Sequence, residues 1–436
     1  MSETNLVSYL QRKVSCFTIT IRNTELASYI KQSLLSAPHV TSLIKGMSYS
    51  SSANLVTGET RISFNIQYDK NISQFPTYLV SNELEIMTAL SLMYRFHSSI
   101  VKIVVDNSKG IITSENAFLL FDKMKKMVDE ELQLAQLSRS TSSYISFAGR
   151  SVYVYTLQND YFDSEKPIND MSCAAAQLAH SFVRECNYNQ HSIIMAIQRW
   201  FRENIQYKNN NITADHSAVG LIRNKTGVCQ AIAAYAYQLL TYSGFQARYV
   251  SGQGNGSGGW GPHGWNMVRI NGAWQHIDFT FELHKLNPVL PRPINEFRLD
   301  HRWDEQYYSA PTSDNYVQTR QALDRSIIVT IPNNPCYSVN GCIVDTSEQS
   351  LFCIIHHGII YVLVFELVKV CGGCYVLKDH TVHMYIDTHE YGINLQSLLY
   401  HKGAWYIQAS QLSKYGYKLD ISGQRLILQY SPRTNT

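Results

Sequence analysis

The chain has 436 residues, of which 45% are hydrophobic and 16% are charged. At about 150 residues per domain this length predicts two to four domains, and the composition excludes an intrinsically disordered protein. The formal charge of +3, from 37 basic and 34 acidic residues, is too balanced for a nucleic-acid-binding surface. The longest apolar run, residues 359–365, has the length of a buried strand and is too short to span a membrane.

The first residues are polar and interrupted by charge, so they lack the apolar segment of a signal peptide. The sequence as given therefore predicts a cytoplasmic protein, although a processed secreted protein would look the same. The nine cysteines are too few for a disulfide-stabilised scaffold.

Residues 1–140 are expected to form a small α+β domain of unknown role. Alternating apolar residues predict strands at 17–21 and 61–68, and helical spacing predicts helices at 82–96 and 114–137. The polar segment 138–143 (SRSTSS) has the composition of a linker.

Residues 144–322 form the second expected domain. Its first part reads as a strand at 146–157 followed by helices at 168–185 and 190–203. The residues with recognisable chemistry follow, between positions 227 and 282.

Cys229 opens a segment whose apolar residues share one helical face and which stops at Gly244. The cysteine is therefore predicted in the first turn of a buried helix. There the helix dipole and free backbone N–H groups favour a thiolate. The alternative is that Cys229 is a small apolar residue of a core helix.

The stretch 254–262 (GNGSGGWGP) is rich in glycine but is not followed by Lys-Ser/Thr or by a helix, so it is not a phosphate-binding loop. We expect it to be a mobile lid or a substrate rim. Trp260 and Trp265 are the candidate rim residues.

Two predicted strands are joined by the Asn-Gly pair at 271–272, the favoured two-residue hairpin turn. This turn places Ile270 opposite Ala273, and it brings His263 and Asp278 to one face as diagonal neighbours. A histidine oriented by a carboxylate, together with a cysteine at a helix start, is the arrangement of nucleophilic thiol catalysis. A structural His–Asp pair on a half-buried sheet is the alternative.

The segments GVCQAIA, RYVSGQ and HGWNMVRINGAWQHIDFTFE resemble the core of the transglutaminase-like superfamily. The resemblance implies a papain-like fold, with a catalytic helix packed on an antiparallel sheet. It implies Cys229 as nucleophile, His263 as general base and Asp278 as the acid that orients the histidine. Ala231 is a mild departure, since bacterial relatives often have glycine there.

The resemblance extends over about residues 187–311. A helix that leads to Tyr207, a short segment at 218–221, and the residues Phe297 and His301 resemble elements that flank the triad in the superfamily. The second donor of the oxyanion hole is not identified by the sequence.

Residues 323–436 contain a weak repeat of about 45 residues. Gly358, Tyr361, Val362 and Leu367 recur as Gly403, Tyr406, Ile407 and Leu412. Each unit reads as a hairpin, a short helix and a second hairpin. The pattern over 326–430 resembles copper amine oxidase N-terminal-like domains, which implies an attachment module and no copper site.

Cys371 and Cys374 form a C-x-x-C in this region, near several further Cys and His residues. A zinc site, a disulfide and two inert thiols are all compatible with this motif. No partner motif has the usual zinc spacing, so inert thiols are favoured and no metal is expected.

The fold class that follows is α+β and multidomain, with a papain-like core between an N-terminal α+β domain and a C-terminal β-rich repeat domain. We expect cysteine-dependent acyl transfer on protein or peptide amides, by hydrolysis or by cross-linking, without a cofactor. The repeats are expected to contact a cell surface or a protein partner. The competing interpretation is an inactive scaffold that acts as a binding module.

Overall fold

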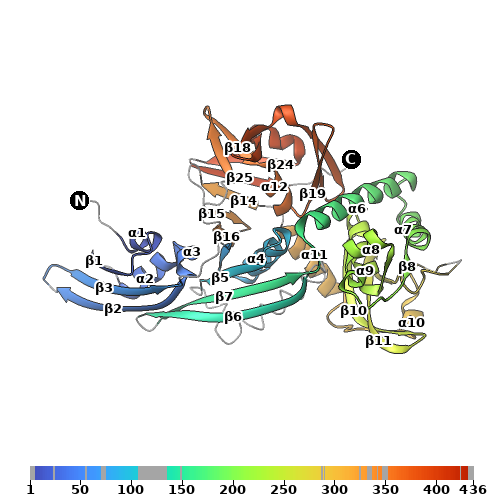
Figure 1. Cartoon of the computed structure of the whole chain (residues 1–436), viewed down its shortest axis with the longest axis horizontal. Coiled ribbons are helices and arrows are strands. Elements are labelled where there is room, and N and C mark those ends of the chain that lie inside the picture. The colour runs from blue at the N-terminus through green and yellow to red at the C-terminus, as the bar shows by residue number, and fades with distance from the viewer. Residues whose placement is uncertain are drawn as a thin grey trace.

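The computed structural model describes residues 5–22, 25–54, 56–69, 75–106, 135–147, 150–285, 288, 290–323, 326–330, 336–340, 342–345, 352–422 and 424–430. Figure 1 shows a small sheet with its helices at one end and a helix-rich part at the other. A larger sheet lies between them and continues into the C-terminal part. Most of the helix expected at 114–137 lies outside the described residues.

The N-terminal part packs helices on antiparallel strands in the order β1-β3-β2. Its elements are α1 (Leu6–Gln11), β1 (Cys16–Arg22), α2 (Leu26–Leu35), α3 (Pro38–Thr41), β2 (Ile44–Asn54) and β3 (Glu59–Tyr68). The strands expected at 17–21 and 61–68 are confirmed, with Ile19 opposite Ile62. The apolar residues of these strands pack on Leu6 and Ile30 of the helices, which explains the alternation.

A nine-stranded sheet follows, in the order β24-β25-β14-β15-β16-β4-β5-β7-β6. Its strands are β4 (Thr77–Val80), β5 (Ile100–Val105), β6 (Ala135–Phe147), β7 (Arg150–Tyr161), β14 (Ser326–Thr330), β15 (Cys336–Val339), β16 (Cys342–Asp345), β24 (Tyr417–Ser422) and β25 (Arg425–Tyr430). Strand β16 pairs with β4, so the first and third expected regions share one sheet. The expected helix at 82–96 is confirmed as α4 (Glu83–Arg95), which begins at its cap Asn82.

The linker expected at 138–143 is wrong, because these residues lie inside strand β6. Strand β6 is the edge of the sheet and pairs only with β7. An edge strand with exposed side chains needs no apolar alternation, and residues 141–144 are exposed. Serine and threonine there look like a loop in the sequence. The strand expected at 146–157 instead covers the end of β6 and most of β7.

The helix-rich part contains the second expected region from residue 165 onward, whereas the first residues of that region lie in β6 and β7 of the nine-stranded sheet. Its helices are α6 (Glu165–Glu185), α7 (Gln190–Asn204), η2 (Thr213–His216), α8 (Ala218–Asn224), α9 (Cys229–Tyr242), α10 (Ile294–Phe297) and α11 (Ala310–Leu323). Its strands are β8 (Gln206–Tyr207), β9 (Thr226–Gly227), β10 (Ala247–Gly256), β11 (Gly259–Ile270), β12 (Ala273–Ile277) and β13 (His301–Arg302). The helices expected at 168–185 and 190–203 are confirmed.

Helix α9 packs on a four-stranded antiparallel sheet of order β12-β11-β10-β13. Ile232 and Leu239 of the helix share one buried cluster with Val268, Ile270 and Ile277 of the sheet. A catalytic-type helix on an antiparallel sheet, as the resemblance implied, is therefore present.

The glycine-rich loop expected at 254–262 is a hairpin instead. Strands β10 and β11 pair in unbroken register from Ala247 opposite Val268 to Gly256 opposite Gly259. Glycines hide this strand in the sequence because they carry no side chain to show alternation. The segment is therefore not a free lid.

The C-terminal part contains the repeat as two hairpin–helix–hairpin units. The first consists of β17 (Cys353–His356), β18 (Ile359–Leu363), α12 (Val364–Val370), β19 (Cys374–Lys378) and β20 (Thr381–Ile386). The second consists of β22 (Leu399–His401), β23 (Ala404–Gln408), η4 (Ala409–Tyr415), β24 and β25. Between the two units lie β21 (His389–Asn394) and η3 (Leu395–Ser397). Strands β18 and β23 pair with Val362 opposite its own repeat mate Ile407, so a local two-fold axis relates the units.

Candidate active site

Cys229 is the first residue of α9, as expected. Val228 is extended before it, and its N–H donates to the Asp215 carbonyl at 3.0 Å. Gly227 has no room for a side chain, because a Cβ there would lie 2.7 Å from Leu221 Cδ1 and 3.1 Å from the Asp215 carbonyl oxygen. The turn into the helix is therefore fixed by packing, and it leaves the Cys229 N–H without an acceptor inside the helix.

His263 and Asp278 are positioned by the hairpin of β11 and β12. Asn271 and Gly272 both have positive φ, as a two-residue turn of this kind requires. The expected register is confirmed, with Ile270 opposite Ala273. Asp278 directly follows β12, and its Oδ1 accepts the backbone N–H groups of residues 280 and 281 at 2.8 and 3.2 Å.

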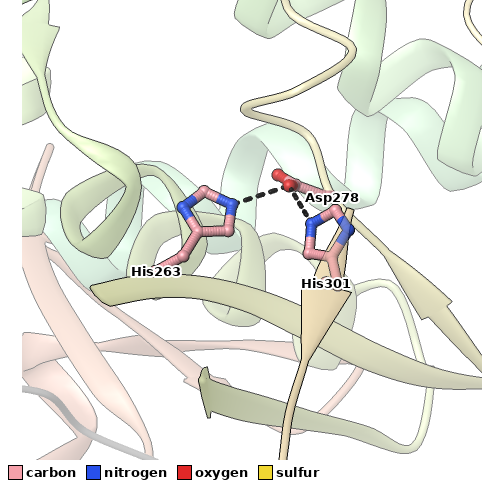
Figure 2. Close-up of side chains that lie close together, drawn as sticks. All are labelled: His263, Asp278 and His301. Carbon is pink, nitrogen blue, oxygen red and sulfur yellow. Dashed lines mark hydrogen bonds and ion pairs between the residues drawn. The ribbon is translucent and has the colours of Figure 1, made fainter. Parts of the chain in front are cut away.

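The structure brings the predicted histidine and aspartate together. His263 Nε2 lies 2.7 Å from Asp278 Oδ2, and their side chains are 7% and 1% exposed. Figure 2 shows both side chains converging on this contact. The Cys229 thiol lies close enough to His263 to act on the pKa of the histidine. Because Nε2 faces the aspartate, we assign the cysteine contact to Nδ1.

His301 is a second histidine on the same carboxylate. Its Nε2 lies 2.9 Å from Asp278 Oδ2, and its Nδ1 lies 2.5 Å from Asp300 Oδ1 (Figure 2 shows the contact with Asp278). Both ring nitrogens thus face carboxylate oxygens. The sequence pointed to His301 only through its resemblance to a flanking segment, and gave it no role.

The pKa values follow from these contacts. Burial alone would lower the pKa of His263, but the hydrogen bonds and charges of Asp278 and Cys229 raise it to about 10. Burial alone would raise the pKa of Asp278, but His263 and His301 hold it well below its usual range. At neutral pH these shifts make the aspartate an anion and His263 an imidazolium.

Tyr207 borders the site although sequence reasoning gave it no role. It lies opposite Gly227 in the short parallel pairing of β8 and β9. Burial first, and then the charges of Cys229 and Asp278, raise the pKa of Tyr207. The side chain is 46% exposed, so it stands at the boundary between the site and solvent.

The two tryptophans have different environments. Trp265 is 1% exposed, and its indole N–H donates to His276 Nδ1 at 2.9 Å. Its proposed position at a substrate rim is therefore wrong, because the strand buries this face under Phe297. Trp260 is 38% exposed, and its ring lies 3.9 Å from the Arg302 guanidinium, so its rim role stays a prediction.

His263, Asp278 and His301 carry three potential metal-ligand atoms, which lie within 4.8 Å of one another. Zinc bound at about 2.1 Å in a tetrahedral site would hold neighbouring ligand atoms roughly 3.4 Å apart. The observed separations of 2.7 and 2.9 Å are hydrogen-bond distances. These residues therefore fit a proton-sharing cluster and do not fit a metal centre.

The cysteines of the C-x-x-C motif point into different cores. The Cys371 thiol lies 2.9 Å from the Tyr417 hydroxyl in the C-terminal cluster. Cys374 belongs to the cluster around α9, where the Tyr242 hydroxyl donates to its sulfur at 3.5 Å. The two thiols thus share neither a disulfide nor a ligand site in this structure.

Residues 176–279 match the family model described as the transglutaminase-like superfamily. The helix-rich part of the chain is therefore similar to this superfamily. No curated protein matches the chain. The matched segment ends before the C-terminal repeats, so their copper amine oxidase-like resemblance stays a prediction.

Three solved structures are similar at low identity. A structure described as a TGase is 13% identical with a TM-score of 0.25, over 48% of this chain and 56% of that one. A "putative cysteine protease" from Cytophaga hutchinsonii is 15% identical with a TM-score of 0.23, over 41% of this chain and 77% of that one. A "putative protease" from Parabacteroides distasonis is 8% identical with a TM-score of 0.22, over 98% and 88%. The chain thus spans little more than half the length of the TGase.

Among the described residues, no helix has the length and apolar character needed to cross a membrane.

Proposed function

We propose that the chain is a cysteine-dependent enzyme that transfers the acyl group of a protein or peptide amide. Cys229 is the nucleophile, His263 the proton carrier and Asp278 the residue that orients the histidine. The observation that carries this proposal is the His263 ring. Its Nε2 lies 2.7 Å from Asp278 Oδ2, and the thiol at the start of α9 is close enough to raise the pKa of the ring.

The chemistry follows from the thiolate–imidazolium pair. Cys229 Sγ attacks the amide carbon, and the backbone N–H of Cys229 donates to the oxyanion that forms. His263 gives its proton to the leaving amine as the C–N bond breaks, which leaves a thioester on Cys229. Water or a primary amine then gives a proton to His263 and attacks the thioester. The thiolate leaves, and the imidazolium is restored.

Water as the second reactant gives hydrolysis or deamidation, and an amine gives a cross-link. Both outcomes share the same first half-reaction. They are separated by incubating the enzyme with a glutamine-containing peptide with and without a primary amine probe. Incorporation of the probe indicates cross-linking, whereas conversion to the acid in both samples indicates hydrolysis.

Selective alkylation tests the proposed pair directly. The wild-type chain is treated with iodoacetamide at about pH 6, where an ordinary thiol with a pKa near 8.5 barely reacts. Peptide mapping should find one fast adduct on Cys229. Exposed Cys16 on β1 should stay almost unmodified and serves as the internal reference.

His263→Ala should lose the fast adduct. His284→Ala, which changes an exposed histidine outside the cluster, is the matched control and should keep it. If Cys229 and Cys16 react at the same slow rate in the wild-type chain, the pair is not active. The inactive-scaffold interpretation would then replace the enzyme, with the C-terminal repeats as the proposed attachment module for a surface or protein partner.

A further inference from the structure

Two buried cysteines from distant parts of the sequence lie against each other outside the active site. Cys173 is in the middle of α6 and is 4% exposed. Cys374 begins β19 in the first C-terminal repeat unit and is 2% exposed. Both belong to the apolar cluster around α9, and the two thiols are close enough for Cys374 to act on the pKa of Cys173.

The contact between α6 and β19 is held by specific backbone hydrogen bonds. Asn169 Nδ2 donates to the Tyr375 carbonyl at 2.8 Å, and the Tyr375 N–H donates to Asn169 Oδ1 at 3.2 Å. Cys173 is four residues after Asn169 and therefore lies on the same helix face. Cys374 directly precedes Tyr375. The two hydrogen bonds between Asn169 and Tyr375 therefore hold Cys374 against the helix face that carries Cys173.

A cavity reaches one member of this pair, Cys374. Its volume is about 630 Å³, and Cys374 is part of its wall. Residues 169–172 of α6 and the Tyr242 side chain of α9 line the same cavity. A volume of this size accepts a small organic molecule.

We propose that Cys173 and Cys374 are a redox-active pair, oxidised to a disulfide by exchange with a low-molecular-weight disulfide that enters this cavity. In the first step the Cys374 thiolate attacks one sulfur of the small disulfide, and a small thiolate leaves. In the second step the Cys173 thiolate attacks the Cys374 sulfur, and the second small thiolate leaves. Two protein thiols are oxidised and one small disulfide is reduced to two thiols.

The bond would tie the C-terminal repeat to the core helix α6 and close a loop from residue 173 to residue 374. Closing a long loop in the unfolded chain raises the stability of the folded one. The hydrogen bond with Cys374, together with burial, raises the pKa of Cys173. Because a thiolate is the attacking species, the second step should become faster as the pH rises.

The test uses the full chain incubated with glutathione disulfide over a range of pH, then blocked with N-ethylmaleimide and digested without reductant. Mass spectrometry should find the peptide of Cys173 joined to the peptide of Cys374, with the loss of two hydrogens. The fraction joined should increase with pH, and the melting temperature should rise by several degrees and return on reduction.

Cys173→Ala and Cys374→Ala should each abolish the joined peptide. Cys371→Ala is the matched control, since its thiol points to Tyr417 and not to the pair. It should form the bond at the wild-type rate. The proposal is overturned if Cys374 is found joined to Cys371. It is also overturned if both thiols are recovered as maleimide adducts after unfolding at every pH. Cys229 takes no part, so this outcome is independent of acyl-transfer activity.

Discussion

His301 lies 2.9 Å from the same Asp278 oxygen that accepts the hydrogen bond of His263 at 2.7 Å. Both ring nitrogens of the second histidine face carboxylates, and its side chain is completely buried. Its position indicates that it holds the carboxylate in place for His263. A histidine that fixes a partner of the reacting pair is a positioning residue.

His301→Phe should reduce kcat by about 10- to 100-fold, the usual effect of losing a partner behind a reacting group. The Asp278 pKa should rise because His301 is one of the groups that lower it. The acid limb of the kcat/KM profile should therefore move to higher pH. His301→Gln can still donate to Asp278 and should recover part of the rate. If the acid limb of the kcat/KM profile is unchanged in His301→Phe, His301 does not act on Asp278 and contributes only packing.

The three proposed triad residues should differ in severity. Cys229→Ala should abolish acyl transfer, because no other group forms the thioester. Asp278→Asn should reduce kcat by up to about 10⁴-fold, because the histidine loses its charge partner and its orientation. Cys229→Ala should still fold, whereas Asp278→Asn should also lower the melting temperature, because it removes the carboxylate that faces both His263 and His301. Full activity in Cys229→Ala would rule out a mechanism through a thioester on Cys229.

The active-site histidine predicts a pH dependence of stability. Folding raises the pKa of His263 from 6.5 to about 10 against the effect of burial, because Asp278 and Cys229 bond it. The associated stabilisation is complete below pH 6.5 and is lost as the pH rises to about 10. The difference in melting temperature between wild type and His263→Gln should therefore shrink over this range. A constant difference would show that folding does not change the pKa of His263.

The hairpin register, the helix beginning at Cys229 and the repeat units could all be predicted from the sequence, because each depends on local spacing. The positions of His301 and Cys374 could not, because they depend on how distant segments pack. The continuation of β10 and β11 into residues 254–262 was missed because the glycines there leave no alternation to detect. The polar edge strand β6 was missed because it is exposed and has a neighbour on one side only.

The two tryptophans differ in burial, and the difference predicts different effects of mutation on stability. Trp265 is 1% exposed and packs in the cluster with Phe297, so Trp265→Ala should destabilise the fold by about 4 kcal/mol. Trp260 is 38% exposed, so Trp260→Ala should change stability by less than about 1 kcal/mol. Urea unfolding of both variants measures the two effects. Equal destabilisation would mean that Trp260 is also part of a core.

Arg248 on β10 is a buried cation surrounded by aromatic rings. It is 1% exposed, and its guanidinium carbon lies 5.0, 4.6 and 4.8 Å from the ring centres of Tyr307, Tyr308 and Tyr316. Its Nη1 donates to Ser313 Oγ at 3.1 Å. In the sequence this arginine looks like an exposed strand residue, because the tyrosines that cover it come from residues about 60 positions later.

Arg248→Met should destabilise the fold by about 2 kcal/mol, because it leaves the partners of the guanidinium unpaired and removes the cation from the rings. Arg248→Lys keeps the charge but loses the planar guanidinium group. Its free energy of unfolding should therefore lie between those of the wild type and Arg248→Met. Urea unfolding gives the free energies. Limited proteolysis should show faster cleavage near residues 303–309 in the Met variant, because this segment is held on β10 by the arginine. If Arg248→Met is as stable as wild type and resists cleavage equally, apolar packing alone holds the segment.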